Sequence, residues 1–131
     1  MKKDIHISEV KDVYIAVVLE YNKAYKVFDW NAYIINNKSV CLDKVIIVTK
    51  GSSRNKITTT FRKKIDALPA KSFAKIEMIQ EAVLSMNNVF NVSFFDDNKL
   101  FDKSFEFQKN SIHKQALKDI PLMSVKGVLA P

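Results

Sequence analysis

The sequence predicts a mainly β protein, an antiparallel sandwich of about seven strands with a short C-terminal helix. Three observations lead to this fold class. Short runs of β-branched and aromatic residues recur along the chain, polar turn residues separate them at intervals of roughly 8–12 residues, and no long helical pattern lies between them. Apolar residues make up 47% of the 131-residue chain, with nine Phe among them, so the chain can bury a substantial core.

The first half of the chain indicates four strands. Residues 13–19 are β-branched and apolar on both faces, as a central buried strand would be. Residues 27–35 alternate, which places Trp30 and Asp29 on opposite faces of a second strand. The third and fourth strands are predicted at 42–49 and 57–62, and the turns or loops at 21–24, 36–39 and 52–55.

The second half contains the clearest hairpin. Aromatic strands at 90–95 and 100–107 flank the polar sequence Asp96-Asp97-Asn98-Lys99, a turn of about four residues. Residues 72–86 are compatible with two structures, because apolar spacings of three and four favour a helix, whereas alternation from Ser72 onward favours a strand. We predict a strand from Ser72 to Ile79, followed by a helical turn through Met86.

The C-terminal segment is expected to complete one domain that spans residues 1–131. Residues 10–107 are rich in strands, and residues 111–131 are predicted to form a short helix and a packed tail. The helix extends from Ser111, which can cap it, to Lys118, and Pro121 prevents its continuation. The apolar residues of the tail indicate that it docks onto the domain.

Four stretches of the chain are similar to segments of a known family: Asp29-Trp30-Asn31-Ala32-Tyr33, Leu68–Glu77, Lys109–Ile112 and Gly127–Ala130. The family consists of short, uncharacterised bacterial proteins, and the resemblance covers nearly the whole chain. It implies no activity. Separately, the succession of a strand, a corner containing proline and another strand from Thr58 to Ile79 is similar to the crossover between sheets in immunoglobulin-like domains. This second similarity implies an immunoglobulin-like sandwich.

Two residue types exclude whole classes of function. The chain has only two glycines, Gly51 and Gly127, so neither a dinucleotide-binding fingerprint nor a phosphate-binding loop can be built. Cys41 is the only cysteine, which excludes an intrachain disulfide. No apolar run approaches the roughly 20 residues of a membrane helix and no secretory signal is visible, so we expect a cytoplasmic protein with no membrane partner.

No metal or catalytic site is predicted. His6, His113 and Cys41 stand far apart, without the short spacing of metal ligands. Ser111, His113 and Asp119 crowd into one predicted helix and cannot converge as nucleophile, base and orienting group. We therefore expect no catalytic residue, no cofactor and no metal, but two surface imidazoles and a small buried thiol. A small enzyme whose site joins distant residues, such as Cys41 and a histidine, is kept as a further alternative.

The charge distribution is the most informative feature for binding. The net charge is +7, and residues 44–64 hold basic side chains but no acidic one. Basic and hydroxyl groups of this kind hold phosphates without reading bases. The candidate residues for contact with nucleic acid or an acidic partner are Lys50, Arg54, Lys56, Arg62, Lys63 and Lys64. The alternative is a solvated edge strand, whose lysines prevent unwanted pairing.

Aromatic residues suggest a second kind of surface. Phe94 and Phe95 are neighbours and must point to opposite faces of their strand, as must Trp30 and Tyr33, so part of the aromatic surface faces outward unless a helix or the tail covers it. The sequence therefore predicts a non-catalytic binding or accessory module that acts through protein–protein contacts, with a protein partner or a homo-oligomer. A nucleic-acid-binding accessory protein that uses residues 44–64 is the alternative.

Overall fold

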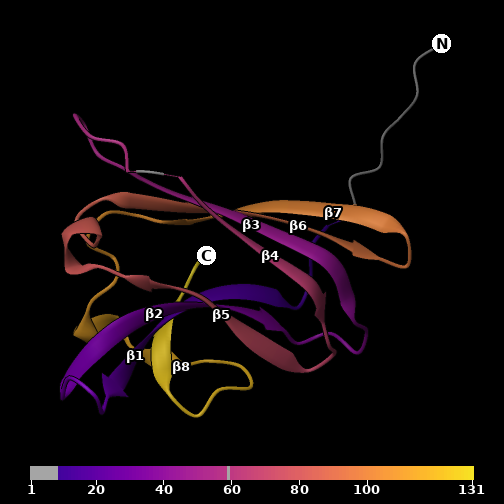
Figure 1. The fold of residues 1–131 in the computed structure, drawn as a ribbon, viewed down its shortest axis with the longest axis horizontal. Helices are drawn as coiled ribbons and strands as arrows, with labels where there is room; N and C mark the ends of the chain where they lie inside the picture. The colour runs from indigo at the N-terminus through magenta and orange to yellow at the C-terminus, as the bar shows by residue number, and fades with distance from the viewer. Residues whose placement is uncertain (1–8, 59) are drawn as a thin grey trace.

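Two antiparallel sheets stack in residues 9–58 and 60–131, the part of the chain that the computed structural model describes (Figure 1). The first sheet has the order β5 (Ser72–Ile79), β2 (Val27–Asn36), β1 (Val13–Asn22), β9 (Lys126–Leu129) and β8 (Lys118–Asp119). The second sheet has the order β4 (Phe61–Leu68), β3 (Leu42–Ser52), β6 (Asn87–Asp96) and β7 (Lys99–Phe107). The second sheet is the upper layer of Figure 1 and the first sheet the lower one. The prediction of a mainly β fold with two antiparallel sheets is confirmed.

The core lies between the two sheets and differs in character on its two sides. The second sheet contributes four phenylalanines that are at most 2% exposed, namely Phe90, Phe94, Phe105 and Phe107. The first sheet contributes aliphatic side chains such as Ile15, Val17 and Ile34. Each fully buried side chain of this size stabilises the fold by about 1.5–3 kcal/mol. Phe95, which alternation placed on the opposite face from Phe94, is exposed.

Strand β1 is buried on both faces, as its uniformly apolar sequence predicted. Ala16 and Val18 point away from the main core and form a second buried cluster with Ile35. The C-terminal tail covers this outer side of the first sheet, where Ile120 is buried and Met123 packs beside it. The sequence analysis missed that the tail also forms strands, because β8 and β9 have only two and four residues.

Gly127 permits the close approach of β9 to β1. A Cβ atom at this position would lie 2.7 Å from the carbonyl oxygen of Val17 and 2.7 Å from Cγ1 of Val18. Neither distance leaves room for a methyl group, so only glycine fits at this point of the strand pair. The pairing brings the end of the tail against the central strand of the sheet.

The β6–β7 hairpin turns over two residues rather than the four that were expected. Asp96 pairs with Lys99, and the residues between them, Asp97 and Asn98, have φ values of 51° and 61°. Positive φ at both central positions is what a type I′ turn requires, and Asp and Asn tolerate this backbone region better than most residues. The right-handed twist of such a turn matches that of the two aromatic strands.

The structure confirms one strand in the second half of the chain, shifts the predicted fourth strand and lacks the predicted helix. The strand from Ser72 to Ile79 is confirmed, and a 3-10 turn over Glu81–Val83 follows it. The fourth strand lies at Phe61–Leu68 instead of 57–62, a range in which Thr59 lies outside the described residues. No helix occupies residues 111–118, where the structure has a single 3-10 turn over Lys114–Ala116.

Both of the last two differences have a physical reason. The basic residues after Phe61 are typical of a loop in sequence. An edge strand nevertheless tolerates lysine and arginine, because one of its two long sides has no neighbouring strand and faces solvent. The predicted helix does not form. The 3-10 turn begins after His113, which makes no side-chain capping bond, and Leu117 is already extended, so that residues 118–119 can pair with β9. None of the helical turns in the described ranges has the length or hydropathy needed to span a bilayer.

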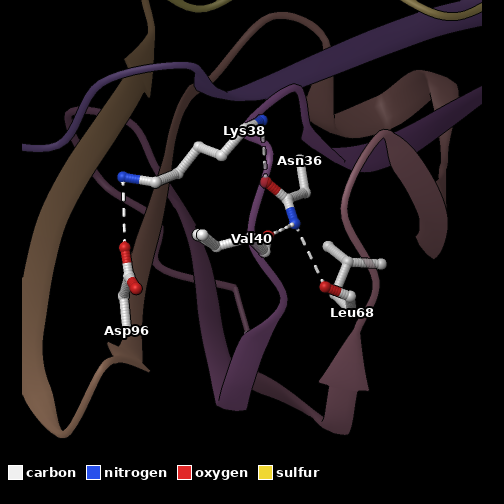
Figure 2. Close-up of polar contacts among 5 residues, drawn as sticks. All are labelled: Asn36, Lys38, Val40, Leu68 and Asp96. Carbon is white, nitrogen blue, oxygen red and sulfur yellow. Dashed lines mark hydrogen bonds and ion pairs between the residues drawn. The ribbon is translucent and has the colours of Figure 1, made fainter.

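A fully buried amide fixes the connection from β2 to β3 (Figure 2). Asn36 Nδ2 lies 2.9 Å from the carbonyl oxygen of Val40 and 3.1 Å from that of Leu68. It also lies 3.0 Å from the carbonyl oxygen of Pro69. Its Oδ1 accepts a hydrogen bond of 3.0 Å from the backbone N–H of Lys38. The side chain thereby ties the end of the first sheet to the turn that follows β4.

The side chain of Lys38 extends the same link to the β6–β7 hairpin. Its Nζ lies 3.4 Å from Asp96 Oδ2 (Figure 2). The same Nζ lies 5.3 Å from the centre of the Phe101 ring. Both charged side chains are mostly buried, so water screens this ion pair less than a surface pair.

Candidate functional site

The β1–β2 hairpin presents aromatic side chains to solvent at one end of the sandwich. Tyr21 is 52%, Tyr25 78% and Phe28 60% exposed. Tyr21 and Phe28 are cross-strand partners, and their rings make an edge-to-face contact at 5.2 Å. They lie on the face of the hairpin that, nearer the middle of the sheet, carries the core residues Val17 and Ala32. The apolar face of the first sheet therefore continues into solvent.

Polar contacts hold this hairpin in shape. Asn22 Oδ1 accepts hydrogen bonds from the backbone N–H groups of Ala24, at 3.0 Å, and Tyr25, at 3.2 Å. Its Nδ2 donates a bond of 2.9 Å to Asp29 Oδ2 on the opposite strand. Such Asx-type contacts order the turn, so Tyr25 is presented at a fixed position.

A hollow of about 590 Å³ opens beside the hairpin. Its apolar wall consists of side chains from β1, β2 and β5, namely Leu19, Val27, Phe28, Trp30, Met78 and Ile79. Asp29, Gln80, Glu81 and Lys114 complete the lining. We call this feature, together with Tyr21 and Tyr25, the aromatic end. A concave apolar surface with a polar rim can accept a large apolar side chain of another molecule and exclude water from it.

A second hollow, of about 490 Å³, lies at the β3–β4 loop and carries positive charge. Arg54 and Lys56 come from the loop, and Lys109 comes from the segment after β7. No carboxylate side chain lies among the described residues that line this hollow. The backbone N–H of Ser53 donates a 2.8 Å hydrogen bond to the carbonyl of Lys56, which closes the loop. We call this feature the basic hollow.

The structure divides the basic residues that the sequence singled out among three places. Arg54 and Lys56 line the basic hollow. Arg62 and Lys64 are exposed on one face of β4, and Lys63 lies on the other face, where its cross-strand partner Ile47 is buried. Lys50, at the end of β3, lies on the same outer face as Arg62 and Lys64 and borders the cleft at that end of the sandwich. These six residues therefore do not form one patch.

The cleft that contains Lys50 lies where β3 and β5 face each other. It has a volume of about 400 Å³ and is lined by Thr49, Glu77 and Phe90 among other residues. Phe61, the first residue of β4, is exposed and lines the same cleft. Because the Glu77 carboxylate accepts a bond from Thr49, it is already partnered within the fold.

Glu20, Asn31 and Tyr33 form a hydrogen-bonded group on the outer side of the first sheet, and this group shifts the pKa of Tyr33. Glu20 Oε1 accepts a bond of 2.7 Å from the Tyr33 hydroxyl and one of 2.9 Å from Asn31 Nδ2. Burial, followed by the hydrogen bond to Glu20 and its negative charge, raises the pKa of Tyr33 to about 12. Tyr33 therefore acts as a hydrogen-bond donor at neutral pH and not as a base.

The residues considered for catalysis are not assembled. His6 lies outside the described residues. His113 is exposed, and its Nδ1 contacts Gln115 Oε1 at 3.2 Å. The expectation of a buried thiol is wrong, because Cys41 is exposed. In residues 9–58 and 60–131, no group of three His, Cys, Asp or Glu side chains is placed to hold a metal ion.

The thiol of Cys41 is not activated by its surroundings. Partial desolvation and then the Asp43 carboxylate raise the pKa of Cys41 above its usual value. Desolvation contributes little to this rise in pKa, because the Cys41 side chain is exposed. The nearby negative charge explains it better, since Asp43 Oδ1 lies 3.7 Å from Sγ. A raised pKa leaves less of the nucleophilic thiolate at neutral pH.

Sequence reasoning missed the aromatic end. It placed a turn at 21–24 but did not foresee that the flanking Tyr21 and Phe28 would remain uncovered. The available signal was the pair of aromatic residues on either side of a polar turn with two lysines, Lys23 and Lys26. Their exposure depends on where the opposite sheet stops, which a local pattern does not contain.

No protein-family model matches the chain, and no curated protein is significantly similar to it in sequence. The resemblance to a family of short bacterial proteins thus stays a prediction.

Proposed function

We propose that this protein is a non-catalytic binding module that engages another protein through the aromatic end. The observation that carries the proposal is the concentration of exposed apolar side chains there: Tyr21, Tyr25, Val27, Phe28 and Met78 are each at least 47% exposed. Exposed apolar patches rimmed by polar residues mark interaction surfaces, and aromatic side chains contribute most of the energy at such surfaces.

The chemistry of the hollow indicates what the partner presents. Its apolar wall suits one or two aromatic or branched aliphatic side chains, which would be buried against Phe28 and Trp30. Glu81 and Lys114 at the rim offer one charge of each sign, so they can orient a polar backbone or a flanking side chain. An extended peptide segment with a bulky anchor residue combines these features.

The proposed fold family agrees with such a role. We infer an immunoglobulin-like topology, in which β1, β2 and β5 correspond to strands A, B and E, and β3, β4, β6 and β7 to strands C, C′, F and G. The orders β5-β2-β1 and β4-β3-β6-β7 support this assignment. Sandwiches of this kind commonly bind partners through the loops at one end. The exposed thiol of Cys41, without a second cysteine in the chain, supports a reducing, cytoplasmic location.

Trp30 provides a direct test. It is the only tryptophan and lines the hollow, so its fluorescence reports occupancy. We expect peptides selected from a random display library to share a bulky apolar anchor and to change Trp30 emission. The Phe28→Ala variant should bind them at least about tenfold more weakly. The control is Val40→Ala, an exposed apolar residue in the β2–β3 connection. Selected peptides that bind Phe28→Ala as tightly as the unaltered protein would refute the proposal.

The basic hollow favours a second candidate function, binding of nucleic acid. Arg54, Lys56 and Lys109 converge on one concavity, and cations so placed contact phosphates. Fluorescence anisotropy of labelled RNA and DNA oligonucleotides at two salt concentrations tests it. Neutralising these three residues should weaken binding far more than the matched variant Arg62→Ala/Lys63→Ala/Lys64→Ala, which removes the same charge. Equal losses would mean that only net charge matters, and flat titrations would remove this candidate.

A further inference from the structure

The outer face of the second sheet is open and carries a graded charge pattern. Cross-strand pairing defines two rows that run from β4 to β7, namely Lys64, Ile46, Ser93, Asp102 and Arg62, Val48, Asn91, Ser104. A third row runs from Lys50 through Val89 to Glu106. The face is thus mainly basic along β4 and the end of β3, where Arg62, Lys64 and Lys50 outnumber the exposed Asp66, apolar or small in the middle, and acidic along β7.

No described segment packs on the apolar middle of this face. Ile46, Val48 and Val89 remain partly exposed and belong to neither of the buried clusters in the described ranges. The corresponding side of the first sheet differs, because Ile120 and Met123 of the tail cover it. A chain that covers one outer face and leaves apolar residues on the other has a surface suited to a partner.

The edges of the second sheet do not provide this contact. Lys63 on β4 and Lys103 on β7 lie on the inner side of their strands, since their cross-strand partners Ile47 and Val92 are buried in the core. Lys103 Nζ lies 4.7 Å from the centre of the Phe105 ring. A lysine that points inward at an edge strand would be buried without a partner if another strand were added, so it prevents edge-to-edge pairing. Association through this sheet must therefore use its face.

We propose that this face binds a second copy of the chain, with a two-fold axis parallel to the strands. Such an axis places β4 of one protomer over β7 of the other. Arg62 and Lys64 of each protomer then face Asp102 and Glu106 of its partner, so the dimer contains two equivalent sets of attractive charges. A two-fold axis across the strands would place β4 over β4 and set like charges together. The charge gradient thus selects one of the two symmetric arrangements, as expected of an isologous interface.

The size of the face indicates a weak dimer. Four strands about 4.8 Å apart and about nine residues long cover roughly 500 Å² in projection. This is at the lower end for a specific interface, since standard ones bury about 800 Å² of accessible surface on each partner. We therefore expect a dimer that forms at micromolar or higher concentrations and that weakens as salt increases.

Charge reversal with mixing tests this arrangement by sedimentation velocity. Arg62→Glu/Lys64→Glu gives a face that is acidic on both sides, and Asp102→Lys/Glu106→Lys gives one that is basic on both sides. Each variant alone should stay monomeric, whereas their equimolar mixture should form a heterodimer more readily than the unaltered protein forms its homodimer. The control, Lys23→Glu/Lys26→Glu, makes the same charge change on the β1–β2 turn and should leave dimerisation unchanged.

Circular dichroism of each variant ensures that a loss of dimer is not a loss of fold. Heterodimer formation by the mixture, with neither variant self-associating, supports the proposal. A mixture that stays monomeric overturns it, as does an unaltered protein that shows no concentration-dependent increase in mass up to the millimolar range. Dimers that persist in both reversed variants would also overturn it, because the interface would then lie elsewhere.

Discussion

The hydroxyl of Thr49, on β3, donates a 2.7 Å hydrogen bond to Glu77 Oε2, on β5, and so joins the two sheets through side chains. Thr49 is only 6% exposed. A bond from a buried hydroxyl to a carboxylate is stronger than a neutral bond at the surface, because the acceptor is charged and little water competes for the hydroxyl. This contact fixes the separation of the sheets at the cleft that also contains Gly51 and Phe90.

We predict that the contact has a measurable coupling energy. A double-mutant cycle with Thr49→Val and Glu77→Ala should give about 1–2 kcal/mol for the free energy of unfolding, measured in denaturant. Each single variant should lower the midpoint of unfolding, and the double variant should lose less than their sum. Strictly additive losses would show that the two side chains do not interact in solution.

Removal of the Asn36 amide should destabilise the fold strongly. In Asn36→Leu the side chain is of similar size, but the carbonyl groups of Val40, Leu68 and Pro69 lose their donor. Since the residue is fully buried, we expect a loss of about 2–4 kcal/mol, measured by chemical denaturation. The exposed neighbour provides the control, and Ser39→Ala should change stability by less than about 0.5 kcal/mol. Comparable losses for both variants would contradict the role given to Asn36.

Substitution of Gly127 should separate the tail from the sheet. The added methyl group of Gly127→Ala would meet the backbone of Val17, which cannot move aside, so β9 must shift away from β1. We expect a cost of about 1–3 kcal/mol, as for overpacking elsewhere. Hydrogen exchange should become faster for the amides of the β1–β9 ladder and stay unchanged in β6. Unaltered protection of Val18 and Gly127 would show that the strands tolerate the methyl group.

The ionisation of Tyr33 predicts a specific dependence on alkaline pH. The pKa of the unfolded phenol is about 10, and in the fold it rises to about 12. The folded state therefore retains this proton over a range in which the unfolded state has lost it. The resulting stabilisation is complete below pH 10 and disappears as pH rises to about 12. An ultraviolet titration of phenolate should contain a late step that Tyr33→Phe removes and that Glu20→Gln shifts to lower pH. Persistence of the late step in Tyr33→Phe would contradict this assignment.

Patterns of period two were sufficient for most strands because their burial repeats locally. The opposite faces of Trp30 and Tyr33 follow from alternation alone. Alternation also favoured the strand at Ser72–Ile79, although apolar spacings of three and four in the same segment competed with it. The same reasoning misplaced β4, since an edge strand needs less apolar sequence than its neighbours. It also missed β8 and β9, because a segment of two to four residues is too short to show an alternating pattern of apolar and polar residues.

The candidate site was less accessible to sequence reasoning. The basic residues from Lys44 to Lys64 form a continuous run in the sequence. In the structure this run spans β3, a loop and β4, and side chains alternate between the two faces of each strand, so the basic groups lie in three different places. Conversely, Lys109 joins Arg54 and Lys56 although more than fifty positions separate it from them in the sequence. Such convergence depends on strand order and on where each layer ends, and neither is encoded in a short segment.

The partnership of β1 with β9 also matters while the chain is being made. The neighbour of β1 at Lys126–Leu129 is translated about a hundred residues after β1 itself, which takes roughly 5–20 seconds. During that interval one side of an apolar strand has unpaired backbone groups, and no inward lysine protects it as Lys63 and Lys103 protect the finished edges. The nascent chain, and not the completed sandwich, is the species most exposed to misassembly with its neighbours on a polysome.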